Sequence, residues 1–283
     1  LLGKTAVNLN FTTGSDALVS AVQQAEIKTI YTSSRFMEKL LTRGMDIAPL
    51  QQHCRLIMLE DLRDATPAAE KLLILASTLL PARVLKRLYC RPYTRDQIAV
   101  ILFSSGSESK PKGVMLSHNN LIANVHQIAE LLNIKQDDLV LANLPPFHAF
   151  GLTVTLFMPM LGRVPVLCHA DPTDVFVTAQ AIAEKGVTHM FGTSSFFRLY
   201  VRNSKVQPHM LNSLKLVIAG AEKLHDDVRE EFRQKFNKDI LEGYGATETA
   251  PVACVNIPDF LSRIRNLRTG WKVGSVGLPV PGT

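Results

Sequence analysis

The sequence predicts an α/β protein with mostly parallel sheets flanked by helices. From residue 98 onward, short runs of β-branched and apolar residues alternate with segments of helical periodicity. The runs are apolar on both faces, which is typical of strands in a parallel sheet that is covered on both sides. With 283 residues, of which 46% are hydrophobic and 20% charged, the chain is long and apolar enough for one large core or two ordinary ones.

The first ninety residues show this pattern weakly, in short expected strands at 5–9, 28–32 and 55–59. An apolar and basic segment follows at 71–91. Pro81 interrupts it, and its apolar run is shorter than the roughly 20 residues that a membrane-spanning helix needs. Basic residues beside Val84, Leu85 and Leu88 would suit a helix lying in a membrane interface. We expect instead an amphipathic helix packed on its own domain.

Beyond residue 97 the alternation is clear. Apolar residues between Leu121 and Leu132 recur on one helical face, and Asn133 ends that pattern. Further strands are expected at 98–103, 139–144, 165–168, 187–191, 214–220 and 239–245, and further helices near 173–185, 194–203 and 226–236. We therefore assign residues 1–97 to part of a first subdomain and residues 98–283 to a core that carries the motifs described below.

The bulk properties exclude several classes of protein. The net charge of +6 comes from scattered basic residues that are not interleaved with aromatic ones, so we expect no nucleic-acid partner. The four cysteines are far apart and form no CxxC pair, which indicates neither a zinc site nor a disulfide framework and favours a reducing cytoplasm. The N-terminus LLGKTAVNLN lacks the features of a signal peptide, and we expect the chain to be a piece of a longer one.

Ligands of parallel sheets collect where strands end at their carboxyl edge, so the loops there are the place to look for a site. The loop FSSGSESKPKG (103–113) offers backbone N–H groups, hydroxyls and lysines, which together suit phosphate oxygens. It is no Walker loop, because Pro111 stands five residues after Gly106, where that motif requires glycine. A solvent-exposed connection rich in serine is the alternative.

Two other loops have the chemistry that a bound nucleotide would still need. In EGYGATET (242–249), glycines flank Tyr244, whose ring could lie on a purine; Thr247 offers a hydroxyl to a phosphate, and Glu248 offers an oxygen to magnesium. In LPPFHAFG (144–151), His148 stands between two phenylalanines. Taken singly, Tyr244 also fits a packed aromatic, Glu248 a surface acid and His148 a core residue.

Five motifs in order, FSSGSESKPKG, PPFHAFG, IAGAEKL, GYGATET and VGSVGLPVPG, resemble the adenylate-forming superfamily of acyl-CoA synthetases, peptide-synthetase adenylation domains and luciferases. Further segments, among them AVNLNFTTG, FGTSSF and ILEGYGATETAPV, are similar to the synthetase half of the bifunctional 2-acylglycerophosphoethanolamine acyltransferase and acyl-[acyl-carrier-protein] synthetase family. The similarity extends over almost the whole chain.

The resemblance implies a fatty-acid ligase that uses ATP and magnesium. A fatty-acid carboxylate would attack the α-phosphorus of ATP, pyrophosphate would leave, and the thiol of acyl carrier protein would capture the acyl-adenylate. The longer parent would lie on the cytoplasmic side of the inner membrane and contact the membrane surface, while this piece would be soluble. The alternative is a non-catalytic module that binds nucleotide, acyl carrier protein or a membrane.

The same resemblance implies roles for individual residues. His148, Thr247 and Glu248 would be catalytic, with Glu248 holding magnesium, and His148, Gly192 and Thr193 would line the acyl site. The ATP-binding residues would be Ser104, Ser105, Gly106, Ser107, Glu108, Lys112, Gly220, Ala221, Glu222, Gly243, Tyr244, Gly245 and Thr247.

The sequence also departs from the superfamily pattern. Glu108 and Ser109 replace the usual threonine and glycine of the phosphate loop. The chain ends at VPGT, before the superfamily's ribose-binding aspartate and its small C-terminal domain, whose lysine contacts the reacting groups, so we expect a partial enzyme. The segment HADPTD (169–174) matches the HxxxxD pattern of acyltransferases, and we attribute this match to chance.

Overall fold

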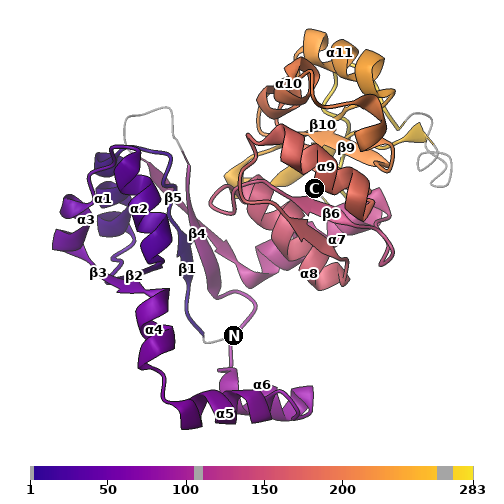
Figure 1. Cartoon of the computed structure of the whole chain (residues 1–283). Coiled ribbons are helices and arrows are strands. Elements are labelled where there is room, and N and C mark those ends of the chain that lie inside the picture. Colours follow the sequence, from indigo (N-terminus) through magenta and orange to yellow (C-terminus); the bar gives the residue numbers. More distant parts are fainter. Residues whose placement is uncertain (1–2, 105–110, 260–269, 283) are drawn as a thin grey trace. The chain divides into compact units, whose positions relative to one another are not determined.

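The computed structural model describes residues 3–104, 111–259 and 270–282, and it divides into two compact units, Leu1–His118 and Asn119–Thr283 (Figure 1). The division falls after His118 and not after residue 97, where the motifs suggested it. The reason is strand pairing, because the two strands that follow residue 97 pair with the first strand of the chain. Each unit is described by itself.

The first unit contains a three-stranded sheet with the order β1-β4-β5 and a parallel pair, β2-β3. Strand β1 runs parallel to β4, whereas β4 and β5 form an antiparallel hairpin. The expected strands at 5–9, 28–32, 55–59 and 98–103 are confirmed, and β5 was not predicted. The strands are β1 (Ala6–Asn8), β2 (Thr29–Thr32), β3 (Arg55–Met58), β4 (Ile98–Ser104) and β5 (Lys112–Ser117).

Four helices accompany these strands, and a small core lies among them. Leu18 and Val22 of the first helix pack with Leu50 and Cys54. The second helix begins at a serine cap, where the Phe36 N–H donates to Ser33 Oγ at 3.2 Å. The helices are α1 (Ser15–Gln24), α2 (Ser34–Thr42), α3 (Ala48–His53) and α4 (Leu59–Ala65).

The segment 71–91 differs from its expectation. It forms two short helices, α5 (Ala68–Ser77) and α6 (Ala82–Tyr89), and Pro81, which cannot continue a helix from the residues before it, is the N-cap of α6. Neither helix has a buried residue, so the expected packing on its own domain was wrong. Among the described residues, no helix combines the length and the apolar character needed to cross a membrane.

The second unit is built on a seven-stranded sheet with the order β12-β11-β10-β9-β8-β6-β7. Strands β7, β6, β8, β9 and β10 are parallel, and β11 and β12 add an antiparallel edge. This confirms the predicted, mostly parallel α/β architecture. The strands are β6 (Val140–Ala142), β7 (Val166–Cys168), β8 (His189–Gly192), β9 (Leu216–Ala219), β10 (Leu241–Gly245), β11 (Val252–Val255) and β12 (Leu278–Pro279).

Helices cover both faces of this sheet because its strands alternate between two cores. On β9, Leu216 and Ile218 join the core beneath α7, whereas Val217 and Ala219 join the core beneath α9, α10 and α11. A buried π-helix, η1 (Gly151–Phe157), also packs on the α7 side. The helices are α7 (His118–Leu132), α8 (Met158–Gly162), α9 (Val175–Lys185), α10 (Ser194–Arg202) and α11 (Asp226–Phe236), with single turns η2 (Pro208–Leu211) and η3 (Thr247–Thr249).

Candidate functional site

Three motif loops of the second unit begin side by side at the carboxyl edge of the parallel strands. The strand register pairs Gly192 of β8 with Ala219 of β9, and Ala219 with Glu242 of β10. The Gly220 N–H donates to the Gly192 carbonyl at 3.0 Å, so the FGTSSF and AGAEKL loops diverge from adjacent backbone positions. The topology thus brings the predicted residues Gly192, Thr193, Gly220, Ala221 and Glu222 together.

The carboxylate of Glu222, in the AGAEKL loop, is hydrogen-bonded to the FGTSSF loop. Glu222 accepts hydrogen bonds from the backbone N–H of Ser195 and from its hydroxyl, the latter at 3.1 Å. Partial burial alone would raise the pKa of the Glu222 carboxyl, but the hydrogen bonds from Ser195 and Thr193 outweigh it and hold the pKa below its usual value. Glu222 is therefore ionised at neutral pH and fixes the turn after β9 to the start of α10.

The turn after β9 also holds a backbone conformation that is unusual for its residue. Ala221 has φ +67°, in the left-handed region that residues with a Cβ rarely adopt. Gly220 lies against an aromatic ring of the LPPFHAFG loop, and a Cβ at this position would stand 3.0 Å from the ring of Phe150. The AGAEKL turn is thus shaped by contacts on two sides, as is common where backbone approaches a ligand.

The GYGATET motif presents three different chemical groups at the end of β10. The Tyr244 side chain is 55% exposed, Glu248 is exposed and Thr247 is partly exposed. The loop folds back tightly, because the Ala246 N–H donates to the Pro251 carbonyl at 3.0 Å. A Cβ on Gly245 would stand 2.0 Å from that same carbonyl oxygen, so only glycine fits there.

Two buried polar residues that sequence reasoning missed support this loop from beneath. Asn124 of α7 donates to the Val252 carbonyl at 2.8 Å and accepts from the Val252 N–H at 3.1 Å. Thr153 of η1 donates its hydroxyl to the Ala250 carbonyl at 3.1 Å. One signal was available, since Asn124 is a polar residue on the predicted apolar stripe of its helix.

His148 lies in the loop that follows β6, the strand next to β8. Its ring contacts Phe147 at 4.7 Å between centroids, and its own side chain remains exposed. Desolvation by surrounding atoms nevertheless lowers the pKa of the imidazole below its usual value. His148 is thus neutral at pH 7 and accessible, and it is not the packed core residue of the alternative interpretation.

The predicted phosphate loop is described only at its two ends. Ser104 is the last residue of β4 and Lys112 the first of β5, and the two are paired in the hairpin. Ser105, Gly106, Ser107 and Glu108 lie outside the described residues. The residues after this segment form strand β5, which sequence analysis did not predict.

The residues at the end of β10 fit magnesium carried by a nucleotide better than a metal held by protein alone. Among the residues that the structure describes, no group of three histidine, cysteine or acidic side chains could hold a metal ion. Magnesium is commonly bound through one or two carboxylates together with phosphate oxygens and water. An exposed Glu248 beside the Thr247 hydroxyl meets that requirement without further protein ligands.

The HADPTD match has a structural explanation. Asp174 caps α9, because its carboxylate accepts the Val177 N–H at 3.3 Å. The His169 Nδ1 atom lies 3.2 Å from the Thr178 hydroxyl and 3.1 Å from the Asp171 carbonyl oxygen. These local bonds account for both residues.

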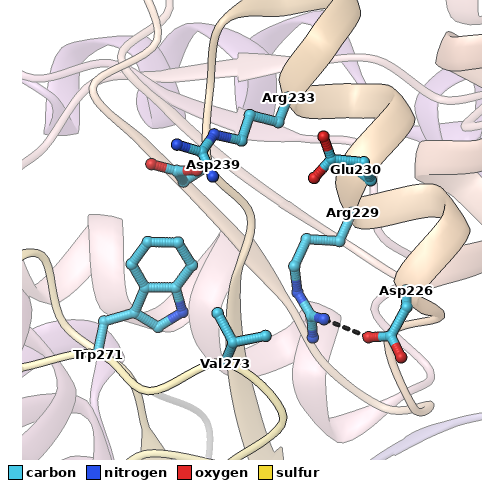
Figure 2. A pocket seen from close by; sticks show the side chains of 7 residues that line it. All are labelled: Asp226, Arg229, Glu230, Arg233, Asp239, Trp271 and Val273. Carbon is cyan, nitrogen blue, oxygen red and sulfur yellow. Dashed lines mark hydrogen bonds and ion pairs between the residues drawn. The ribbon is translucent and has the colours of Figure 1, made fainter.

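A pocket of about 280 Å³ lies against α11 and contains none of the predicted site residues (Figure 2). Arg229 projects into it and pairs with Asp226 and with Glu242 of β10. Trp271 and Val273 form the opposite wall. Since Arg229 is buried and bound to Glu242, this network anchors β10 just before Tyr244.

Comparisons with known proteins agree with these observations. The family model described as AMP-binding enzyme matches residues 1–283. A long-chain-fatty-acid–CoA ligase of Salmonella typhimurium is 31% identical over 202 residues, which are 69% of this chain and 34% of that protein. A medium-chain fatty-acid–CoA ligase of Escherichia coli strain K12 is 32% identical over 189 residues, 65% of this chain and 32% of that protein. The chain thus spans about a third of the length of these curated relatives.

Solved structures show the same fold. The anthranilate CoA ligase AuaEII in complex with anthranoyl-AMP matches 99% of this chain and 50% of its own, with a TM-score of 0.76 and 21% identity. A malonyl-CoA ligase with methylmalonyl-CoA and AMP bound matches 99% of this chain and 52% of its own, with a TM-score of 0.73 and 19% identity.

Proposed function

Because the chain belongs to the AMP-binding enzyme family, we propose that it carries the nucleotide and acyl site of an ATP-dependent acid–thiol ligase that activates a fatty acid. The observation that supports this most is the convergence of three motif loops at one edge of the sheet, with Glu222 bonded to Ser195 and Tyr244 exposed. The relatives named as fatty-acid–CoA ligases favour a fatty acid as the substrate.

The reaction we propose has two steps. A carboxylate oxygen attacks the α-phosphorus of ATP, and the bond to pyrophosphate breaks. A thiol then gives up its proton to solvent, its sulfur bonds to the acyl carbon, and AMP leaves with the electron pair of the broken bond. The chain would contribute by positioning the reacting groups and by stabilising the charge that develops on phosphate.

The residues at the carboxyl edge of the sheet would bind different parts of the two substrates. The exposed ring of Tyr244 would stack on adenine, bordered by Gly220, Ala221 and Glu222. Thr247 would donate to the α-phosphate, and Glu248 would hold the magnesium that neutralises phosphate charge. His148, neutral at pH 7, would lie by the carboxylate, with Gly192 and Thr193 along the acyl chain.

Phosphate binding by Ser104, Lys112 and the intervening serines and glycine stays a prediction. So does acyl carrier protein as the thiol acceptor. Coenzyme A presents the same phosphopantetheine thiol, and the curated relatives are named as CoA ligases. The acceptor must therefore be tested with both thiols in parallel.

Exchange of label between pyrophosphate and ATP tests the first step, together with direct titration of ATP. We expect ATP to bind in the presence of magnesium, and exchange, at the low rate of a partial enzyme, to depend on added long-chain fatty acid. Glu248→Gln should weaken both, whereas Glu184→Gln, which removes an exposed carboxylate from α9, should leave them unchanged. Absence of ATP binding by the folded chain, or equal loss in both variants, would refute the proposal.

A further inference from the structure

Helices α5 and α6 and the turn between them carry an apolar surface that the rest of the first unit, as far as the structure describes it, does not cover. Leu72 and Leu73 of α5 are 67% and 70% exposed, and Leu79, in the turn between the helices, is 87% exposed, far more than leucines in a folded domain usually are. The four aliphatic residues Leu72–Leu75 follow one another and are all exposed. Successive helical residues are 100° apart, so these four side chains point in different directions around α5, and Glu70 and Lys71 project between them. An exposed apolar surface of this kind is one that the working protein must cover.

The same segment is basic. Residues 68–91 contain five lysines and arginines, and Glu70 is the one acidic residue in that stretch of sequence. On α6, Arg83, Lys86 and Arg87 are spaced i, i+3 and i+4 and share one face, while Val84 and Leu88 lie on the other. An apolar face beside a lysine- and arginine-rich face is the pattern of helices that lie in a membrane interface.

The lengths of the helices restrict how they can meet a bilayer. α5 has 10 residues and α6 has 8, which correspond to about 15 and 12 Å. A spanning helix needs roughly 20 residues, so this pair can lie in the interface but cannot cross it. A second copy would bring the same basic residues of α6 against one another, whereas an anionic bilayer offers the opposite charge beside an apolar boundary.

We propose that α5 and α6 bind the surface of an anionic lipid bilayer, with the leucines in the acyl boundary and the basic residues at the phosphate headgroups. The positive charge complements the negative surface, and each basic residue near such a surface contributes about fivefold in binding. This inference does not depend on the ligase reaction, and its test measures lipid binding without turnover.

The test is co-sedimentation of the 283-residue chain with phosphatidylcholine vesicles that contain or lack phosphatidylglycerol. We expect binding to the anionic vesicles that weakens as salt is added, and much weaker binding to phosphatidylcholine alone. Replacing Leu72, Leu73 and Leu79 by serine should reduce binding on the order of tenfold per leucine. Arg83→Gln, Lys86→Gln and Arg87→Gln together should reduce it on the order of a hundredfold.

Matched controls change the same residue types on exposed positions elsewhere in the first unit. Leu41→Ser with Leu59→Ser, and Arg35→Gln with Lys39→Gln and Arg43→Gln, should bind as the wild type does. Circular dichroism confirms that each variant is folded. The proposal is overturned if the wild type does not bind anionic vesicles, or if the α5–α6 variants bind as well as their controls. It is also overturned if ultracentrifugation shows a stable dimer that the serine variant dissociates while lipid binding is absent.

Discussion

Replacing Asn124 by leucine should loosen the loop that presents Tyr244 and Glu248, although Asn124 lies on α7. Its side chain is 3% exposed and satisfies both the N–H and the C=O of Val252, which is itself buried. Leucine is similar in volume but offers neither a donor nor an acceptor. The variant therefore leaves two buried backbone groups without these partners.

The size of the effect follows from those two groups. A buried polar group that loses its partner costs about 1–3 kcal/mol, so Asn124→Leu should lower the free energy of unfolding by about 2–4 kcal/mol. For a unit of this size, a loss of 3 kcal/mol corresponds to a fall in Tm of about 6–12 °C. Asn124→Asp should be at least as harmful, because its carboxylate would face the Val252 carbonyl.

Urea unfolding followed by tryptophan fluorescence measures this directly. Trp271 is the one tryptophan of the sequence and belongs to the second unit, so its signal reports on the unit that contains Asn124. His126→Leu, on an exposed position of the same helix, is the control and should change stability little. If Asn124→Leu unfolds within about 0.5 kcal/mol of the wild type, the support that we assign to Asn124 does not exist.

Three further predictions use the same fluorescence assay. Folding lowers the pKa of the Glu222 carboxyl, so the contribution of Glu222 to stability is present above the unfolded pKa of about 4.3 and is lost as pH falls through the folded pKa. The wild type should therefore lose more stability on acidification than Glu222→Gln does. Equal losses in the two proteins would contradict this. Gly245→Ala should lower the free energy of unfolding by about 2 kcal/mol or more, because the new Cβ would collide with the Pro251 carbonyl. The control Gly162→Ala, whose Cβ would make an ordinary 3.4 Å contact, should change stability little. Similar losses in both variants would refute the close approach at Gly245. Lys215→Met removes the ion pair, 2.8 Å long, between Lys215 and buried Asp138. Because Lys215 itself is largely exposed, the free energy of unfolding should fall by about 1–2 kcal/mol. An unchanged urea midpoint would show that the ion pair does not stabilise the fold.

Most of the second unit could be predicted, because strands that are buried on both faces of a sheet appear in the sequence as continuous apolar runs. Each expected strand from 139 to 245 overlaps a strand of the sheet, and the helices expected near 173–185, 194–203 and 226–236 are confirmed. The helical segments η1 and α8, between β6 and β7, were not predicted. Strand β5 was missed because its sequence KGVMLS begins with the lysine and glycine that were assigned to the phosphate loop. Pairing with β4 decides its conformation, and pairing between distant segments is not visible in local periodicity.

The candidate site was predictable in its parts and less so in its connections. Glycines and polar residues after strands identified the loops, since these positions need unusual backbone or exposed chemistry. The bond from Glu222 to Ser195 could not be inferred, because it depends on side-chain directions at the ends of two strands. The apolar character of α5 was plain in the sequence, but periodicity says which face is apolar and not whether anything covers it.

The central claim is that the loops after β8, β9 and β10 form one nucleotide site, and hydrogen–deuterium exchange with and without ATP and magnesium tests it most directly. The account predicts slower exchange in peptides covering 192–195, 220–222 and 243–248, because bound nucleotide would shield these backbones together. Unchanged exchange in all three peptides at saturating ATP, or protection confined to other parts of the chain, would contradict it.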